Sequence, residues 1–374
     1  MDPLNICIIK PNKAAFSETF VQEHIDGIKG NKKVLYGGAF PIYDNEDDYL
    51  IKSKIGLLSY LIQKKIFRKK DIRIRNNALV NYLQKEKTDV VFAEYGMVGA
   101  MVTKACKMAN VPLVIHFHGA DVHRQPTIKE YLPFYKKAFS YASVLIAVSV
   151  DMAEELIKLG APASKIITSS CGVDTLKFPL LDISKSGRNF LSVGRFVEKK
   201  SPSSILNAFK IVTGKFPDAR LWMVGNGPLF NKTNDLVKKL GLENCVILTG
   251  VLNGDQIREL MKQSRCFVQH SVTASDGDKE GTPVTILEAG ASGLAIVSTL
   301  HAGIKDAVIN GETGYLVPEH DVEEMAAYMI KIAADVDLAV RLGLKEAAHI
   351  RKYYDTRDRI NTLNSILQNS VKRK

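Results

Sequence analysis

The chain has 374 residues, 46% of them apolar and 24% charged, a composition typical of a soluble globular protein large enough for two domains. No apolar run is long enough to span a bilayer, and no basic stretch precedes an apolar one at the start, so we expect neither a membrane span nor a signal peptide. The formal net charge of +11 indicates an anionic partner: a phosphorylated small molecule, an acidic lipid surface or a nucleic acid.

The cysteines are odd in number and scattered, and most of them stand in apolar runs: Cys7, Cys106, Cys171, Cys245 and Cys266. This distribution predicts buried thiols in a reducing compartment and argues against disulfides or a zinc site. We therefore expect a cytoplasmic protein.

Short apolar strands alternate with helical patterns through the first half of the chain. Strands are predicted at 5–9, 33–36, 89–93, 113–117, 144–147 and 166–169, and helices at 20–30, 78–85, 99–108 and 150–159. Alternation at this spacing predicts a parallel sheet covered by helices. This first domain is expected to span residues 1–171.

The segment 172–188 breaks the alternation, contains Pro179 and Gly187, and is predicted to be a linker. A second domain is expected over 189–355. Its strands are predicted at 190–193, 221–224, 246–249, 266–269, 295–298 and 315–317, and its helices at 201–213, 230–240, 256–262, 284–291 and 322–333. The fold class is therefore α/β, with two doubly wound domains in tandem that bind ligands beyond the carboxyl ends of their strands. The stretch 356–374 is predicted to be an amphipathic helix.

The segment 52–75 holds nine basic residues against one acid, Asp71. Apolar residues are interspersed among the charges: Ile51, Ile55, Leu58, Leu61, Ile62 and Phe67. Such a mixture predicts either a cationic amphipathic surface for anionic lipid or a solvated helix lying over the core.

The stretch 280–289 is predicted to be a loop that turns into a helix. Pro283 suits the first helical position and Thr282 suits the cap before it. An anion between Glu280 and Glu288 would meet the positive end of the helix, and hydroxyl groups beside it would meet two carboxylate acceptors. The local sequence thus indicates a site for a sugar joined to a phosphate, although a well-capped structural helix would look the same.

Further candidates follow the predicted strands of the second domain. After 190–193, Gly194 would allow a tight turn. Arg195 and Lys200 would suit a diphosphate, because a guanidinium can donate two parallel hydrogen bonds and an ammonium is a compact positive charge. Lys199 is expected to be solvated. Two other strand ends could form a mononucleotide pocket, with Gly225, Asn226 and Gly227 as a wall and the backbone at Val251 facing the base.

In the first domain, His118 ends a strand and is followed by a glycine and Asp121, which raises the prospect of a catalytic histidine. Ser17 is a plausible helix cap beside Glu18. No zinc spacing is present and Asp276-Gly277-Asp278 stands in a polar loop expected to be mobile, so no metal is expected. Nucleic-acid binding would rest on charge alone, and we do not expect it.

The residues from Ser275 to Gly293 resemble the E-x7-E motif of retaining glycosyltransferases of family four, with Glu280 and Glu288 as its two glutamates. Other similar pieces are Gly194-Arg195 with Lys200, 225–228, His118-Gly119, 172–174, 311–317 and 16–20, the last resembling members that build exopolysaccharides and lipopolysaccharides. The resemblance covers nearly all of the chain. It implies the GT-B fold, in which two Rossmann-like domains face each other across a cleft and the C-terminal helix crosses back to the first domain.

The resemblance also implies the role of each candidate residue. Arg195 and Lys200 would hold the diphosphate of a nucleotide sugar, Glu288 would accept from the ribose, and Glu280 would contact the transferred sugar. The donor site would be completed by the backbone of Gly281, Thr282, Pro283 and Val284. From the other domain, His118 would lie near the sugar, with Ser17, Glu18 and Asp121 on the acceptor side. The anomeric configuration would be retained without a required metal or other cofactor.

Several positions depart from the family pattern. Ser201 and Ala302 each replace a glycine, Cys171 replaces an asparagine, and Asp306 replaces a glutamate. The first strand-to-helix loop, 10–16, lacks glycines. These departures concern loop geometry and the acceptor more than the donor site.

The sequence therefore predicts transfer of a hexosyl group from a UDP- or GDP-linked sugar to a lipid-linked or polysaccharide acceptor in cell-surface glycan synthesis, with peripheral attachment to the inner face of the plasma membrane as a further expectation. Two alternatives are a nucleotide-sugar epimerase of the same fold and a non-catalytic protein that binds membranes or polyanions.

Overall fold

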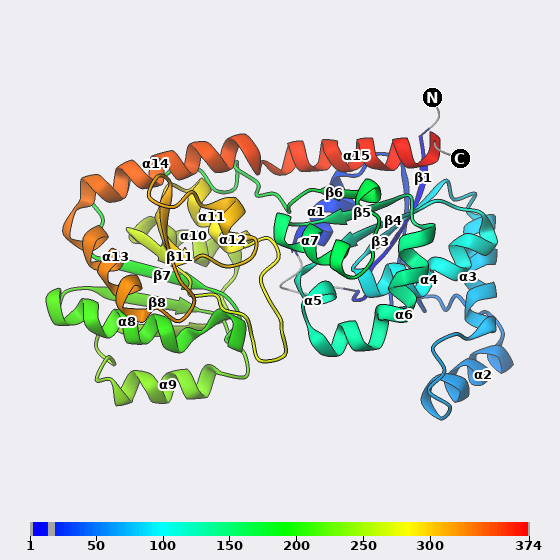
Figure 1. Ribbon diagram of the computed structural model, residues 1–374, viewed down its shortest axis with the longest axis horizontal. Coiled ribbons are helices and arrows are strands. Elements are labelled where there is room, and N and C mark those ends of the chain that lie inside the picture. The colour runs from blue at the N-terminus through cyan, green and yellow to red at the C-terminus, as the bar shows by residue number, and fades with distance from the viewer. Residues whose placement is uncertain (1–2, 14–18, 373–374) are drawn as a thin grey trace. The chain divides into compact units, whose positions relative to one another are not determined.

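The computed structural model describes residues 3–13 and 19–372, and the chain divides into two compact units (Figure 1). Unit 1 comprises Met1–Ser170 and Arg357–Lys374, and unit 2 comprises Cys171–Thr356. Residues 172–188, expected to be a linker, are part of unit 2. The candidates Ser17 and Glu18 lie outside the described residues.

Unit 1 contains a parallel six-stranded sheet in the order β2-β1-β3-β4-β5-β6. The strands are β1 (Asn5–Ile9), β2 (Asn31–Leu35), β3 (Val90–Glu94), β4 (Leu113–Phe117), β5 (Val144–Ala147) and β6 (Ile166–Thr168). The helices are α1 (Thr19–Gly27), α2 (Lys54–Lys65), α3 (Arg73–Lys85), α4 (Gly96–Ala109), α5 (Gly119–Val122), α6 (Gln125–Tyr141) and α7 (Val150–Lys158). Every residue of β3 and β4 is buried, as expected for central strands covered on both faces.

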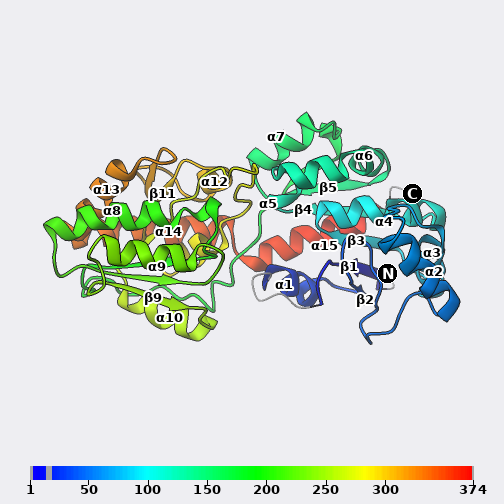
Figure 2. The same cartoon turned by 90° about the horizontal axis from the view of Figure 1, so that it is seen from below.

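Unit 2 repeats this architecture with the strand order β12-β11-β10-β7-β8-β9. The strands are β7 (Asn189–Val193), β8 (Arg220–Val224), β9 (Val246–Gly250), β10 (Cys266–Val268), β11 (Ala295–Thr299) and β12 (Gly314–Val317). The helices are η2 (Glu198–Lys200), α8 (Pro202–Lys215), α9 (Phe230–Lys239), α10 (Gly254–Gln263), α11 (Val284–Ala291), α12 (Ile304–Ala307), α13 (Val322–Ala334) and α14 (Val336–Tyr353). Figure 2 shows α8 and α10 on opposite sides of this sheet, where they cover separate apolar clusters.

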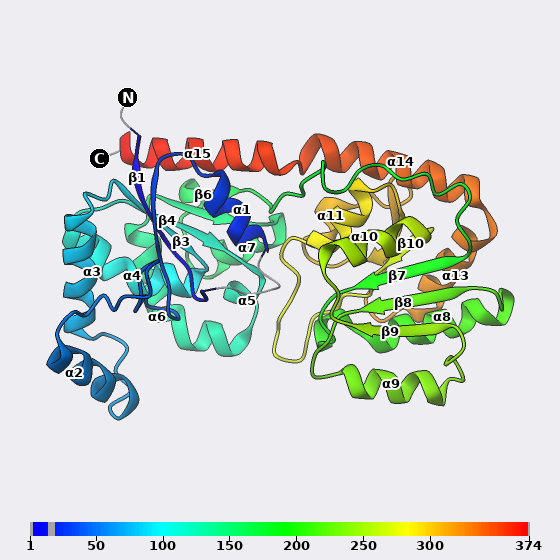
Figure 3. The same cartoon turned by 180° about the vertical axis from the view of Figure 1, so that it is seen from behind.

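The helix α15 (Thr356–Lys372) completes the core of unit 1 (Figure 3). Leu363, Ile366 and Leu367 pack with Ile6 and Phe92 of the sheet in one buried cluster. The Asn364 side chain accepts a hydrogen bond from the backbone nitrogen of Lys29 at 2.8 Å. The final helix therefore belongs to the first domain, as the GT-B resemblance implied.

The α/β fold class is confirmed, with two parallel sheets wrapped by helices, and each of the twelve strands lies close to its expected position. Two long helices were not predicted. One of them, α6, contains Pro133, which in a sequence is a helix-breaking signal. The other, α14, follows α13 after a single residue, Asp335, whose side chain caps it by accepting from Leu338. Among the described helices, none has the length and hydrophobicity needed to cross a bilayer.

The order of strands fixes where ligands are expected to bind. The order in which strands are added to the sheet changes side between β1 and β3 in unit 1 and between β7 and β10 in unit 2. In open parallel sheets, ligands bind beyond the carboxyl ends of the strands at such switch points. The loops that follow β7 and β10 carry Lys200 and Glu280, and β3 ends at Glu94.

Candidate active site

Two loops meet at the switch point of unit 2, and three consecutive residues of η2 join them. Glu198 accepts hydrogen bonds from the backbone nitrogen and hydroxyl of Ser275 at 2.8 and 2.7 Å. The Lys199 ammonium lies 3.1 Å from the Asp278 carboxylate and donates to the carbonyl of Lys279 at 3.1 Å.

One expectation was wrong here. Lys199 is not solvated, because its side chain is only 20% exposed and is engaged by the loop. The polar loop around Asp278, which we expected to be mobile, is bound by η2 at both Ser275 and Asp278. Sequence distance concealed these contacts, since the partners are about 80 positions apart in the chain.

Lys200 and Glu280 form the buried centre of this site. The Lys200 Nζ lies 3.1 Å from Glu280 Oε1, and their side chains are 17% and 8% exposed. Burial lowers the pKa of Lys200, and the neighbouring Glu280 carboxylate opposes that shift. Burial alone would raise the pKa of Glu280, but the charges of Lys200 and Lys199 outweigh it and hold that pKa below its usual range. The Glu280 carboxylate is therefore ionised at neutral pH.

A second pair of residues holds the backbone of Glu280 in place. The Glu280 backbone nitrogen donates to His301 Nε2 at 3.2 Å, and His301 Nδ1 lies 2.6 Å from the Glu319 carboxylate. The other Glu319 oxygen accepts from the backbone nitrogen of Thr273 at 2.8 Å. His301 thus accepts through Nε2 and donates through Nδ1. The sequence alone had assigned no role to His301.

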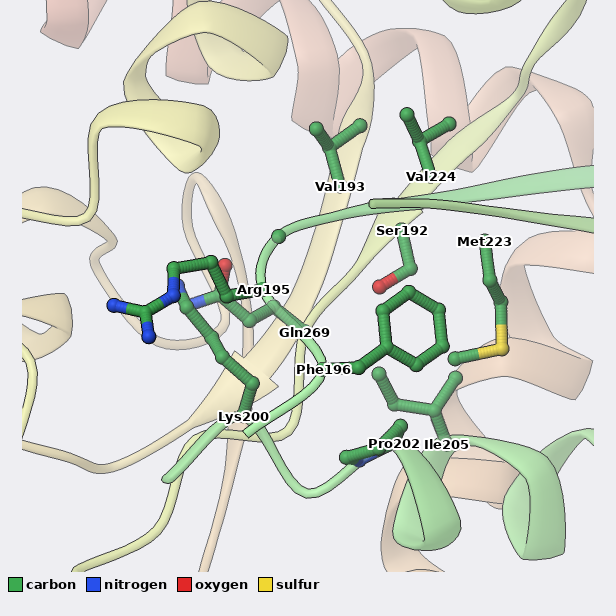
Figure 4. Close-up of a pocket in the computed structure, with 11 residues that line it drawn as sticks. Ser192, Val193, Arg195, Phe196, Lys200, Pro202, Ile205, Met223, Val224 and Gln269 are labelled. Carbon is green, nitrogen blue, oxygen red and sulfur yellow. The ribbon is translucent and has the colours of Figure 1, made fainter. Parts of the chain in front are cut away.

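Arg195 stands beside this pair but is exposed and makes no ion pair with any described residue. Figure 4 shows the Arg195 and Lys200 side chains on the same side of the loop after β7, while Phe196, Ile205 and Met223 line an apolar hollow on the other side. On the polar side, Lys200 is therefore already paired with Glu280, and Arg195 is available to an anion.

Gly194, where a tight turn was expected, has a φ outside the left-handed region. A Cβ at this position would lie 3.5 Å from Cε of Lys200, an ordinary contact. The backbone thus tolerates a side chain here, and that side chain would occupy space beside Lys200.

Gly225 and Gly227 are required by a close approach between loops. Their φ values are +131° and +158°. A Cβ would lie 2.0 Å from the Gly194 carbonyl oxygen at Gly225, and 2.6 Å from the Phe196 carbonyl oxygen at Gly227. The loop after β8 therefore packs directly on the loop after β7. Asn226 and Val251, the other residues predicted for the nucleotide pocket, are exposed at the ends of β8 and β9.

The start of α11 differs by one residue from the prediction. Pro283 is the cap and Val284 is the first helical residue, without a side-chain cap. The Thr282 hydroxyl accepts from the backbone nitrogen of Cys171 at 3.1 Å, and Thr282 stands one position before the cap it was predicted to be. Gly281 precedes this turn, and Glu288 is half-buried one turn into the helix.

Two of the family's glycine positions carry other residues in a left-handed backbone conformation. Ser201 has a φ of +35° and Ala302 a φ of +36°. Residues with a Cβ are strained there by about 1–3 kcal/mol each. Ser201 follows Lys200 and Ala302 follows His301, so both strained residues border the site.

In unit 1, Glu94 at the end of β3 is completely buried and surrounded by three histidines. Its carboxylate lies 2.7 Å from His24 Nδ1 on α1, 3.4 Å from His116 Nδ1 on β4 and 3.0 Å from His118 Nε2 just after β4. Tyr95, the next residue, has a strained φ of +77°. The signal for this cluster was a carboxyl at the end of a buried strand, which sequence reasoning missed together with His24.

The charges of this cluster follow from its burial. Burial would raise the pKa of Glu94, but His24 and the hydrogen bonds from the histidines outweigh it and hold the pKa well below its usual range. Burial lowers the pKa of His116 to about 4. The ligand atoms of His24, Glu94 and His116 lie within 4.8 Å of one another, which is compact enough for a metal ion. Because the imidazoles already satisfy the carboxylate, we interpret the cluster as a proton-sharing group.

His118 is packed between rings and is 7% exposed. Its centroid lies 4.6 Å from Phe20, 4.7 Å from Tyr95 and 4.5 Å from His116. Asp121 is also buried, and its carboxylate accepts from the backbone nitrogens of Gly96 at 2.8 Å and of His118 at 2.9 Å. Asp121 therefore ties the loops after β3 and β4 together.

The chain contains two consecutive family segments. Residues 60–177 match Glycosyltransferase Family 4, and residues 176–349 match the glycosyl transferases group 1. The chain belongs to these glycosyltransferases.

This glycosyltransferase is 29% identical to the amylovoran biosynthesis glycosyltransferase AmsK of Erwinia amylovora, over 75% of the chain and 70% of AmsK. It is 30% identical to the Escherichia coli protein WcaL, provisionally named a colanic acid biosynthesis glycosyltransferase, over 64% of the chain and 60% of WcaL. It is 26% identical to an Escherichia coli enzyme named UDP-Gal:alpha-D-GlcNAc-diphosphoundecaprenol alpha-1,3-galactosyltransferase, over 69% of the chain and 70% of that enzyme.

Solved structures with the same fold cover the whole chain. Sucrose-phosphate synthase from Thermosynechococcus elongatus matches with a TM-score of 0.78 at 17% identity, over 99% of this chain and 100% of that one. Anabaena HepE in complex with UDP-glucose matches with a TM-score of 0.76 at 18% identity, with the same coverage. At these identities the likeness shows the GT-B fold and nothing further.

Proposed function

We propose that the chain is a retaining glycosyltransferase that moves a hexosyl group from a UDP- or GDP-linked sugar to a lipid-linked or polysaccharide acceptor in cell-surface glycan synthesis. The observation that carries this proposal is the buried Lys200–Glu280 pair at the switch point of unit 2, with Arg195 exposed beside it. The names of AmsK and of the diphosphoundecaprenol galactosyltransferase support the choice of acceptor.

The charges of the site suit a diphosphate. Lys199 is paired with Asp278 and Lys200 with Glu280, so Arg195 is left as the net positive charge for the incoming anion. As the bond to the sugar breaks, negative charge grows on the leaving diphosphate, and Arg195 and Lys200 stabilise it. Removing one such donor typically costs a hundredfold or more in rate, roughly 2.7–4 kcal/mol. Arg195 and Lys200 are the two groups to which the proposal assigns this stabilisation, and it invokes no metal.

The carboxylates have separate proposed roles. Glu280 is held in position by Lys200 and by His301. Its carboxylate accepts a hydrogen bond from a hydroxyl of the transferred sugar. The Lys200 ammonium donates hydrogen bonds both to Glu280 and to the diphosphate. Glu288 accepts from the ribose, and the backbone at 281–284 closes the pocket. An acceptor hydroxyl then bonds to the anomeric carbon on the face that the diphosphate leaves, and its proton passes to the departing diphosphate. Attack on this face retains the anomeric configuration. We place this activity at the inner face of the plasma membrane.

Thermal unfolding with a panel of UDP-, GDP- and ADP-sugars tests the donor site. A ligand present at a hundred times its Kd stabilises the folded protein by about 2.7 kcal/mol. Lys200→Met and Glu280→Gln should each lower turnover by about a hundredfold or more, whereas Lys210→Met, at an exposed position on α8, should leave it unchanged.

Single replacements in a buried ion pair can destabilise the fold, because they leave one charge without its partner. The double variant Lys200→Met/Glu280→Gln removes both charges and should fold yet remain inactive. Full turnover by the folded double variant would refute the catalytic role. Formation of an epimerised nucleotide sugar without any acceptor would favour the epimerase, and absence of all nucleotide-sugar binding would favour a non-catalytic protein.

A further inference from the structure

The helix α2 has two apolar faces, but only one of them is buried. On the inner face, Gly56 is buried and Tyr60 is 1% exposed and packs with Ile51 and Ile72 in a small cluster of unit 1. Ser53 caps the helix by accepting from the backbone nitrogen of Gly56. The helix is therefore anchored by its inner face, and its outer face points away from the core.

The outer face and the turn after it expose an unusual amount of apolar side chain. We define the α2 outer surface by its six large apolar residues, which are exposed as follows: Ile55 83%, Leu58 59%, Leu61 38%, Ile62 37%, Ile66 69% and Phe67 63%. Ile55, Leu58, Ile62 and Ile66 follow one another at intervals of three and four residues, so they line one side of the helix. Contiguous exposed apolar patches of this kind mark interaction sites.

Cations are interspersed with these apolar residues along the chain. The residues from 49 to 70 include no acid. Five cations there have no acidic partner within 4 Å among the described residues: Lys54, Lys64, Lys65, Arg68 and Lys69. By contrast, Lys52 pairs with Asp48 and Lys70 with Glu130. Arg75, counted with this segment from the sequence, is buried against Phe40 and takes no part.

The exposed apolar residues and the unpaired cations together indicate which partner binds the α2 outer surface. A second copy of this chain would bring the same cations against each other, which charge repulsion disfavours. An anionic lipid interface accepts the apolar side chains among its acyl chains and the ammonium groups among its phosphates. From this complementarity we infer that the α2 outer surface docks the protein onto an anionic lipid bilayer.

The position of α2 in the fold agrees with this inference. Figures 1 and 3 show α2 at the outer edge of unit 1, beyond α3 and away from the strands. The inference deepens the proposed function, on which it rests for its biological purpose, by naming the surface that would bring the enzyme to a lipid-linked acceptor. Binding to lipid itself requires no activity and can be measured separately.

The test is co-sedimentation with vesicles of phosphatidylcholine containing phosphatidylglycerol, compared with vesicles of phosphatidylcholine alone. The unaltered 374-residue chain should bind the anionic vesicles and lose binding as salt is raised, because screening weakens the attraction. Replacing the five unpaired cations by glutamine should lower the partition coefficient by at least about a hundredfold, since each contributes roughly fivefold near an anionic surface.

A matched variant separates this surface from charge in general. Lys210, Lys215, Lys232, Lys238 and Lys239 are exposed on α8 and α9, and replacing these five by glutamine gives the same net charge. This control should bind like the wild type. In a third variant, Leu58→Ser/Ile62→Ser, both side chains are already exposed, so the fold should persist while binding falls about a hundredfold or more.

Insertion can be followed directly. In Phe67→Trp, indole fluorescence should shift to the blue on adding anionic vesicles, against a constant background from Trp222, the chain's single natural tryptophan, which lies on β8. The inference would be overturned if the α8–α9 control lost as much vesicle binding as the α2 variant. It would also be overturned if the protein bound no vesicles but self-associated, and Leu58→Ser/Ile62→Ser abolished that self-association. The stabilisation of the α2 variants by nucleotide sugars is measured in parallel. If it persists while vesicle binding is lost, the docking surface and the donor site have been tested separately.

Discussion

At Gly194 the backbone would accept a side chain, but we expect that side chain to hinder a ligand bound beside Lys200. The φ of this residue is not left-handed, and an added Cβ makes only ordinary contacts with the Lys200 side chain. We therefore expect Gly194→Ala to raise the free energy of unfolding by about 0.4–1 kcal/mol, by restricting the unfolded chain. The same methyl group should weaken nucleotide-sugar binding, as measured by calorimetry.

The matched control for this prediction is Gly214→Ala on α8, where an added Cβ has nothing within 4 Å. This change should stabilise the protein without affecting ligand affinity. Unaltered affinity in Gly194→Ala would show that the diphosphate does not approach on this side of Lys200.

Glu94 is the clearest case of a charge held by its neighbours. Because the histidines keep its pKa well below the usual value, the ionised carboxylate stabilises the fold fully above a pH of about 4.5, and that stability is lost as the pH falls through the lowered pKa. Glu94→Gln leaves three imidazoles without their carboxylate and should cost about 3–5 kcal/mol at pH 7.

Chemical denaturation from pH 7 to pH 3 measures this difference. The gap between wild type and Glu94→Gln should shrink as the pH falls, because the wild-type carboxylate becomes neutral as well. A constant gap across the range would mean that packing, not charge, explains the loss. The loss should appear in unit 1, whereas nucleotide-sugar stabilisation of unit 2 should persist.

At the scale of elements, α14 places a carboxyl group against α11, the helix that carries Glu288. Glu346 is fully buried there, and a Cβ at Gly290 of α11 would lie 2.8 Å from its Cγ. Burial raises the pKa of Glu346 from 4.5 to about 8, a rise that the Thr313 hydroxyl offsets only in part. The two helices therefore pack over a carboxyl group that is protonated at neutral pH.

The raised pKa makes stability fall with rising pH. Below pH 4.5 Glu346 is protonated in both the folded and the unfolded chain; above it the unfolded chain loses the proton first, so stability falls as the pH rises toward 8. Glu346→Gln keeps the shape without the titration and should raise the free energy of unfolding at pH 8 by about 3–5 kcal/mol. The exposed Glu312→Gln is the control; equal pH profiles for wild type and Glu346→Gln would contradict the prediction.

For the whole molecule, the stability of unit 1 depends on a helix encoded at the other end of the chain. Leu367 on α15 is 1% exposed within the unit 1 core. Leu367→Ala should cost about 2–5 kcal/mol, with the loss confined to unit 1. Hydrogen exchange should show faster exchange in β1, β3 and β4 and unchanged exchange in β7 and β10.

The reciprocal variant is Leu342→Ala on α14, where the side chain is 3% exposed in a unit 2 core. It should accelerate exchange in β7 and β8 and spare unit 1. If either change accelerated exchange in both sheets equally, the two units would unfold as one cooperative body.

The strands could be predicted because buried parallel strands are nearly continuous apolar runs, as in β3 and β4. Lys200, Arg195 and Glu280 could be named because they follow such strands. Their pairing could not, since the contacts of η2 with the loop after β10 join distant positions. Glu94 was missed for the same reason: its three histidines come from two distant segments, α1 and the end of β4, and no local spacing in the sequence indicates that they converge on it.

The membership of α15 in unit 1 also sets an order for folding on the ribosome. Unit 2 is an insertion within unit 1, because residues 171–356 interrupt the two parts of the first unit. Nascent domains fold as units once their residues have emerged. Unit 2 can therefore complete its sheet while the apolar surface later covered by α15 is still open, and the N-terminal domain is the last to be finished.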